Sequence, residues 1–185
     1  MAINWTGGSA LPLFSDCCVH LQVMYKRICL EASPSEYHQE NTALTWVKDL
    51  QRADVEFLRS LPYTISVPSY NIIVVHAGLV PGVPLHSQHS ADMTKMRGLV
   101  KESDGSYTGT TSKAYGPWAA SWIGPQYLFF GHNASRGLQE HPFAMGLDTG
   151  CVYGRQLTGA IVSSATHKPR LFSVAAQQVY SIPQI

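Results

Sequence analysis

Charged residues are scarce in this sequence. Asp, Glu, Lys and Arg together make up 14% of its 185 residues, whereas a free-standing soluble domain usually has about 25%. The shortage indicates that part of the surface is covered by something outside this chain, as in a fragment or an oligomer. The formal net charge of +1 gives no electrostatic reason to expect a nucleic-acid or membrane partner.

Paired cysteines and long apolar runs are also missing. The 4 cysteines form no CxxC pair, which argues against a structural zinc site, and the adjacent Cys17 and Cys18 do not suit a disulfide framework. No apolar run approaches the ~20 residues that a membrane helix needs. The first residues do not resemble a signal peptide. We therefore predict a reducing, cytoplasmic setting.

Two short apolar runs each end near a histidine and a glycine. Ile72–Val75 is a β-branched run followed by His76-Ala77-Gly78, and Tyr127–Phe130 is followed by Gly131-His132-Asn133. The first run predicts a strand buried on both faces of an α/β sheet. Such sheets hold ligands at the carboxyl ends of their strands. A single histidine there is usually structural, but two of them predict convergent metal ligands.

The remaining pattern predicts several short elements. We expect helices over 19–30, over 42–61 with a break near 51–53 and a stop before Pro62, and over the helical-looking stretch 90–100, with its end at Met96-Arg97. We expect a strand over 64–67 that forms a hairpin with the Ile72 strand, a polar loop over 101–111, and a final antiparallel sheet from Phe143 onward. Trp118 and Trp122 lie beside prolines, which suits a packed loop or a pocket wall.

Five motifs occur in an order that resembles a known family. They are HAGLVPG at 76–82, Met96-Arg97, Trp122-Ile-Gly-Pro125, FGHN at 130–133 and PFAMGLDTGCVYGRQLTG at 142–159. Together they resemble the C-terminal part of a calcineurin-like metallophosphoesterase of the Ser/Thr protein phosphatase superfamily, and more narrowly the symmetrical bis(5'-nucleosyl)-tetraphosphatases. The resemblance spans roughly 42–162. We therefore predict that 42–185 is the C-terminal part of such a domain and that 1–41 is a segment without family motifs.

The resemblance implies a fold, a cofactor and a reaction. The fold class would be α/β (α+β), a partial β-sandwich flanked by helices. Two divalent metal ions (Mn, Fe or Zn) would activate a water for attack on phosphorus. His76 and His132 would be ligands of the second metal, and Arg97 would hold the phosphate. Asp148 would be a turn residue or would support the ligands. The substrate would be a phosphorylated small molecule, a dinucleoside polyphosphate or a phosphoprotein.

The sequence departs from this family in its first half. The family's GDxHG, GDxxDRG and GNHD or GNHE motifs, which supply most metal ligands, do not occur. We therefore expect the N-terminal catalytic half to be missing, an open sheet edge beside the His76 strand, and an uncovered apolar face.

Three hypotheses follow from that departure. The chain is a truncated, inactive product of a phosphatase gene, or a hydrolase whose site is completed by a partner chain or by residues such as Asp16, His20 and His38. As a third alternative, it is a non-catalytic phosphate- or partner-binding module.

Overall fold

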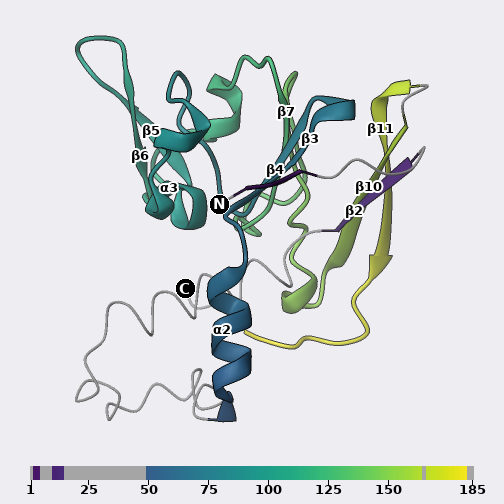
Figure 1. Ribbon diagram of the computed structural model, residues 1–185. Helices are drawn as coiled ribbons and strands as arrows, with labels where there is room; N and C mark the ends of the chain where they lie inside the picture. Colours follow the sequence, from purple (N-terminus) through teal and green to yellow (C-terminus); the bar gives the residue numbers. More distant parts are fainter. Residues whose placement is uncertain (1, 5–9, 15–48, 164–165, 183–185) are drawn as a thin grey trace.

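A computed structural model describes residues 2–4, 10–14, 49–163 and 166–182 (Figure 1). The expected helix over 19–30, most of the first helix of 42–61, and Asp16, His20 and His38 lie outside these residues. No helix in the described ranges is long and apolar enough to cross a membrane.

Two sheets and one hairpin form the framework. The main sheet has the order β1-β3-β4-β7-β9-β8, the second sheet has the order β11-β10-β2, and β5 pairs with β6. The strands are β1 (Ala2–Asn4), β2 (Ala10–Phe14), β3 (Thr64–Val67), β4 (Ile72–Val75), β5 (Gly98–Lys101), β6 (Tyr107–Thr110), β7 (Tyr127–Phe130), β8 (Gln139–Glu140), β9 (Ala144–Gly146), β10 (Gln156–Ser163) and β11 (Thr166–Ala175).

The helices are short. Within the described ranges the α-helices are α2 (Arg52–Ser60) and α3 (Ser90–Lys95), and the 3-10 turns are η3 (Pro68–Tyr70), η4 (Leu85–Ser87), η5 (Trp118–Ser121) and η6 (Cys151–Tyr153). Helix α2 extends away from the sheets (Figure 1). It begins at the predicted break and ends before Pro62, because proline disfavours a helical residue before it.

Strand β4 lies at the centre of both cores, as its apolar run predicts. Ile72 packs with Phe129 of β7 and Ala160 of β10 in one cluster. This cluster joins the two sheets face to face, which makes a β-sandwich. The alternation of side chains along a strand sends Ile73 and Val75 to the opposite face. The prediction of a strand buried on both sides is therefore confirmed.

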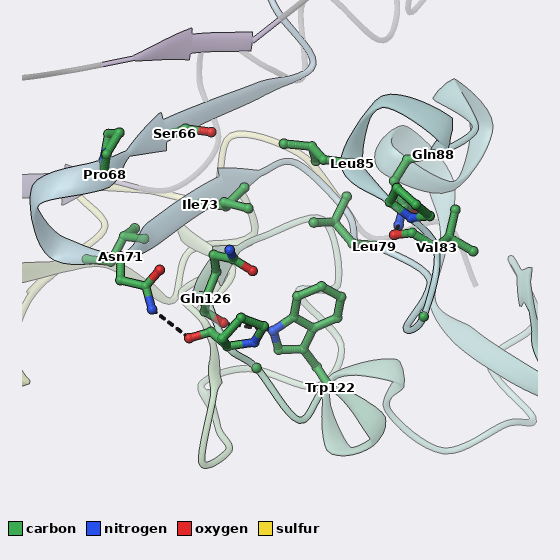
Figure 2. A pocket seen from close by; sticks show the side chains of 15 residues that line it. Ser66, Pro68, Asn71, Ile73, Leu79, Val83, Leu85, Gln88, Trp122 and Gln126 are labelled. Atoms are coloured by element: carbon green, nitrogen blue, oxygen red, sulfur yellow. Dashed lines mark hydrogen bonds between the residues drawn. The ribbon is translucent and has the colours of Figure 1, made fainter.

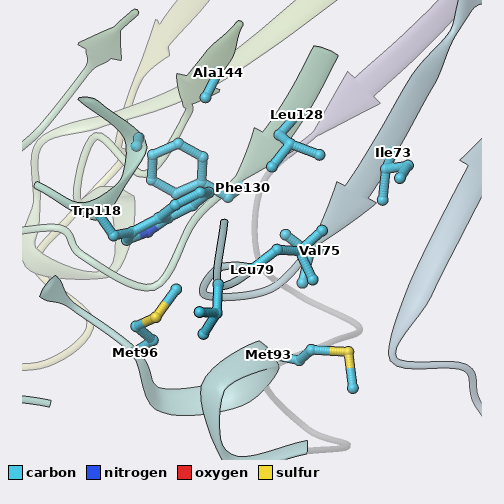
Figure 3. Close-up of a cluster of buried hydrophobic side chains, with 11 residues drawn as sticks. Ile73, Val75, Leu79, Met93, Met96, Trp118, Leu128, Phe130 and Ala144 are labelled. Carbon is cyan, nitrogen blue, oxygen red and sulfur yellow. The ribbon is translucent and has the colours of Figure 1, made fainter. Parts of the chain in front are cut away.

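The opposite face of the main sheet is covered by α3, η5 and the loop after β4. Met93 of α3 and Met96, which caps that helix, pack with Trp118 of η5. The centroid of the Trp118 ring lies 4.7 Å from that of Phe130. Figure 3 shows these side chains gathered over Val75 and Leu128. Trp118 is thus the packed-loop tryptophan, while Trp122 is only partly buried and lines a pocket.

Several predicted elements differ from the structure. The sheet has no open edge beside the His76 strand, because β4 lies between β3 and β7, and β1 pairs with β3 on its far side. The helical stretch expected over 90–100 is α3 only as far as Lys95, because the residues from Gly98 pair with β6 as strand β5. Of the loop expected over 101–111, only 102–106 forms the turn, since Tyr107–Thr110 is strand β6. In the expected final antiparallel sheet, β10 pairs with β11 as predicted. Strand β9 instead joins the main sheet, parallel to β7.

Strand pairing links the two segments that the expected boundary at residue 41 separates. Strands β1 and β2 come from the segment 1–41, and they pair with β3 and β10 of the segment 42–185. The boundary itself stays a prediction.

Candidate functional site

The site is built where β4 and β7 end side by side. The two strands are parallel, with Ile73 opposite Leu128 and Val74 opposite Phe129. The segments that follow the two strands leave the sheet at the same edge. There the backbone N–H of Gly131 donates to the carbonyl of His76 at 2.8 Å. His76 is buried at this edge, with 2% of its surface exposed.

His132 takes an unusual backbone conformation. Its φ is +67°, a left-handed value that residues with a side chain seldom adopt. The N–H of Asn133 donates to Gly131 O at 2.8 Å across this residue, and the Asn133 side chain, itself buried, accepts from Ser135 at 2.8 Å. Such strain costs about 1–3 kcal/mol and tends to occur at functional sites. The loop thus holds one imidazole in a fixed, strained position.

The two imidazoles converge as the sequence predicts. His76 Nε2 lies 3.0 Å from His132 Nδ1, and the rings are tilted by 59° with centroids 4.8 Å apart. Two nitrogens that bind one ion at about 2.1 Å lie about 3.0 Å apart at a right angle and about 3.4 Å apart at a tetrahedral angle. The observed separation therefore fits two neighbouring ligands of one divalent ion.

Among the described residues, the candidate metal ligands at this site are these two imidazoles. Within the described ranges no group of three or more His, Cys, Asp or Glu side chains could hold a metal ion. Catalytic sites normally keep three protein ligands. Two imidazoles fit part of a metal site, and no reaction step through a metal follows from them.

Arg97 follows Met96, the residue that caps the C-terminus of α3. Its N–H donates to Thr110 O at 2.8 Å, and its side chain is half-buried. The buried Nε of Arg97 has no hydrogen-bond partner among the described residues. No hydrogen bond joins its side chain to either imidazole within the part of the chain that the structure describes. Its phosphate-binding role stays a prediction.

Asp148 is a turn residue, as expected. Its Oδ1 accepts from the N–H of Gly150 at 3.1 Å. The turn leads into the segment that carries Arg155, whose Nη1 donates to Ala134 O at 3.0 Å. Arg155 therefore ties the His132 loop to the Gly150 loop. The sequence motif contains this arginine, but its spacing gives no sign of that contact.

A separate pocket of about 560 Å³ lies along the face of β4 (Figure 2). It is enclosed by the β3–β4 hairpin, the loop after β4, and the segment from Trp122 to Gln126. The sequence analysis named a pocket wall as one of two possible roles for Trp122. It did not predict that Asn71, Gln88 or Gln126 would line a pocket, because single amides in loops follow no periodic pattern.

Comparisons with known proteins point in one direction. No protein-family model matches the chain. The chain is 24% identical over 147 residues to the asymmetrical bis(5'-nucleosyl)-tetraphosphatase PrpE of Oceanobacillus iheyensis, covering 76% of this chain and 56% of that protein. It is 28% identical over 136 residues to the protein of the same name from Bacillus velezensis, covering 66% of this chain and 51% of that protein. The chain thus spans about half the length of these curated relatives.

A solved structure has a similar fold. It is the crystal structure of a protein described as a candidate diadenosine tetraphosphatase, with a TM-score of 0.72 and 22% identity over 95% of this chain and 97% of that one. At this identity the similarity concerns the fold. The chain therefore has the mixed α/β fold of a diadenosine tetraphosphatase-like protein, and the two relatives named above carry the name bis(5'-nucleosyl)-tetraphosphatase.

Proposed function

We propose that this chain carries part of the active site of a metal-dependent phosphoesterase that hydrolyses dinucleoside polyphosphates. The observation that carries the proposal is the 3.0 Å approach of His76 Nε2 and His132 Nδ1 at the ends of two parallel strands. The names of the relatives and of the similar structure support the substrate class.

Each residue has a part in this proposal. His76 and His132 would hold a divalent ion such as Mn²⁺, Fe²⁺ or Zn²⁺ through neutral imidazole nitrogens. A bound metal pair supplies a polarised phosphoryl oxygen and a water of lowered pKa. Arg97, whose buried Nε has no hydrogen-bond partner in the described residues, would pair its guanidinium with phosphate oxygens.

The chain alone is proposed to turn over slowly or not at all. The GDxHG, GDxxDRG and GNHD or GNHE motifs, which supply most of the family's metal ligands, do not occur in the sequence, and catalytic sites normally keep three protein ligands. The same observation favours the second candidate, a non-catalytic module that binds phosphate or a partner chain.

The first experiment measures bound metal and turnover on one sample. The purified chain is equilibrated with Mn²⁺ and desalted, the bound ion is counted, and hydrolysis of an aryl phosphate and of diadenosine tetraphosphate is followed. The His76→Ala and His132→Ala variants should each lose the retained ion, and the exposed His86→Ala should not. Retention that survives both site substitutions would refute the proposed ligands. Turnover with two retained ions would refute the inactive form of the proposal.

The products identify the cleavage type if turnover occurs. The sequence motifs resemble the symmetrical enzymes, which split diadenosine tetraphosphate into two ADP molecules, whereas both relatives are named asymmetrical. Asymmetrical cleavage gives ATP and AMP. Chromatography of the products therefore separates the two types.

A further inference from the structure

The pocket beside β4 has the size and lining of a small-molecule site. Its volume of about 560 Å³ falls within the ~300–1,000 Å³ that ligand pockets usually occupy. Its apolar lining includes the buried Ile73 and Leu79. None of the described residues that line it is charged. The pocket therefore suits a neutral, largely apolar group rather than a phosphate.

One wall of the pocket is a fixed aromatic ring. The indole Nε1 of Trp122 donates to the carbonyl of Gln126 at 2.9 Å. This bond satisfies the only polar group of the side chain and restrains the ring plane. In Figure 2 the Trp122 ring stands beside Gln126, with Leu79 and Ile73 farther along the pocket. A restrained indole offers a flat face on which another planar ring can stack.

Neutral polar groups line the same space. Asn71 Nδ2 donates to Pro125 O at 2.7 Å, which fixes the amide and leaves its Oδ1 as an acceptor. Gln126 and Ser66 add an amide and a hydroxyl to the lining. Gln88 is different, because its amide is already bonded to Val80 and Val83. A stacking face beside uncharged donors and acceptors matches the edge of a heteroaromatic base.

The pocket and the imidazole pair share one strand. Ile73 of β4 lines the pocket, and His76 follows three residues later at the carboxyl end of the strand. Three residues of extended chain span about 10 Å. Between them the same face of β4 is filled by the buried side chains of Val75, Leu79 and Trp118. The pocket is therefore separate from the imidazole pair, and a ligand in it does not extend along this face to His76.

We infer that this pocket binds a neutral heteroaromatic ring of the size of adenine, with the ring stacked on Trp122. The inference goes beyond the proposed function, because the pocket is separate from the imidazole pair. It adds a second binding site and the residues that recognise its ligand.

The test uses adenosine, which carries the base without phosphate, and the full chain without added metal. Calorimetric titration should show one adenosine bound per chain. Trp122→Leu should weaken this binding about tenfold or more, since stacking on an aromatic side chain contributes about 1–3 kcal/mol per base. Ile123→Ala is the matched control, because Ile123 is the next residue, is 81% exposed and does not line the pocket. It should bind adenosine like the parent chain.

A second variant guards against a folding defect in Trp122→Leu. Ser66→Phe fills the pocket from β3 and leaves Trp122 and the other lining residues unchanged. It should also abolish adenosine binding while retaining the parent's circular dichroism. Binding that is equal in the parent, Trp122→Leu and Ser66→Phe would overturn the inference, as would a parent chain that binds no adenosine.

The two proposals can fail separately. His76→Ala should lose Mn²⁺ and keep adenosine, whereas Trp122→Leu should keep Mn²⁺ and lose adenosine. Mn²⁺ retention without adenosine binding overturns the base pocket alone. Adenosine binding that depends on Trp122, without any Mn²⁺ retention, overturns the proposed ligands and supports the pocket.

Discussion

His132 Nδ1 lies 3.0 Å from His76 Nε2 across 56 positions of sequence, and His132 alone of the pair has a left-handed backbone. The register of β4 and β7 explains why the backbone at His132 takes this left-handed conformation. Ile72 pairs with Tyr127, so the same offset sets Gly131, not His132, opposite His76. His132 thus lies one residue beyond the position opposite His76, and its left-handed backbone turns the chain so that its ring approaches His76.

The strain at His132 predicts an order of stability among its variants. His132→Asn and His132→Gly should both exceed His132→Ala by about 1 kcal/mol in free energy of unfolding, because glycine and asparagine tolerate positive φ and alanine does not. All three should lose the retained Mn²⁺ equally. Urea denaturation and metal counting on the same preparations check both points. An alanine variant as stable as the glycine variant would show that the left-handed conformation relaxes without the imidazole.

The strand ends of the site could be read from the sequence, and its surroundings could not. The runs Ile72–Val75 and Tyr127–Phe130 are apolar, and a histidine follows within two residues of each, so both strands and the meeting of the histidines were predictable. The β5–β6 hairpin was missed because Glu102–Ser106 are turn formers, which hide short strands on either side. The pocket was missed because Asn71 and Gln126 become neighbours only through the parallel pairing of β4 and β7.

Gly78 lies in a space too small for a side chain. A Cβ at this position would lie 2.5 Å from Met96 Cε and 2.6 Å from Trp118 Cε2. The methionine end can move, but the buried indole cannot without disturbing the core. Gly78→Ala should therefore destabilise the fold by about 1–3 kcal/mol, as measured by urea denaturation.

Gly116→Ala is the matched control for that substitution. Nothing lies within 4 Å of a Cβ at Gly116, and its φ is not positive. Its stability should stay within about 1 kcal/mol of the parent, with any change toward greater stability, because alanine restricts the unfolded chain. Equal losses in the two variants would contradict the packing of Trp118 over Gly78.

Asp92 should make the fold less stable as the pH rises. Burial raises the pKa of the Asp92 carboxyl above its ordinary value of 3.8, although His89 opposes the change. The folded state then binds the proton more tightly than the unfolded state. The resulting stability is complete below pH 3.8 and is lost as the pH rises through the folded pKa. Relative to the parent, Asp92→Asn should therefore gain free energy of unfolding as the pH rises from below 3.8 through the folded pKa of Asp92.

Asp104 should show the opposite sign. Hydrogen bonds from the hydroxyl and the N–H of Ser106, at 2.6 and 2.9 Å, lower the pKa of the Asp104 carboxyl. The stability that this carboxyl contributes is present above pH 3.8 and is lost as the pH falls through the folded pKa. Asp104→Asn should thus lose stability relative to the parent as the pH rises. Denaturation curves over the acid range check both variants, and slopes of the same sign would contradict the assignment.

Gln88 holds the loop between β4 and α3 with a single side chain. Its Oε1 accepts from the N–H of Val80, and its Nε2 donates to the carbonyls of Val80 and Val83, each at 2.9 Å. The side chain is buried. Gln88→Ala would leave these backbone groups unsatisfied, and each such group costs about 1–3 kcal/mol. The variant should therefore lose about 2–4 kcal/mol of stability, allowing for partial access of water.

Gln88→Glu separates hydrogen bonding from loss of volume. The carboxylate has nearly the same shape and can still accept from Val80 N–H, but it cannot donate to either carbonyl. If the bonds matter, Gln88→Glu should be strongly destabilised at neutral pH and should recover in acid, where the protonated carboxyl regains one donor. The exposed Gln178→Ala should match the parent throughout. A glutamate variant as stable as the parent at neutral pH would show that the loop is held by its apolar packing alone.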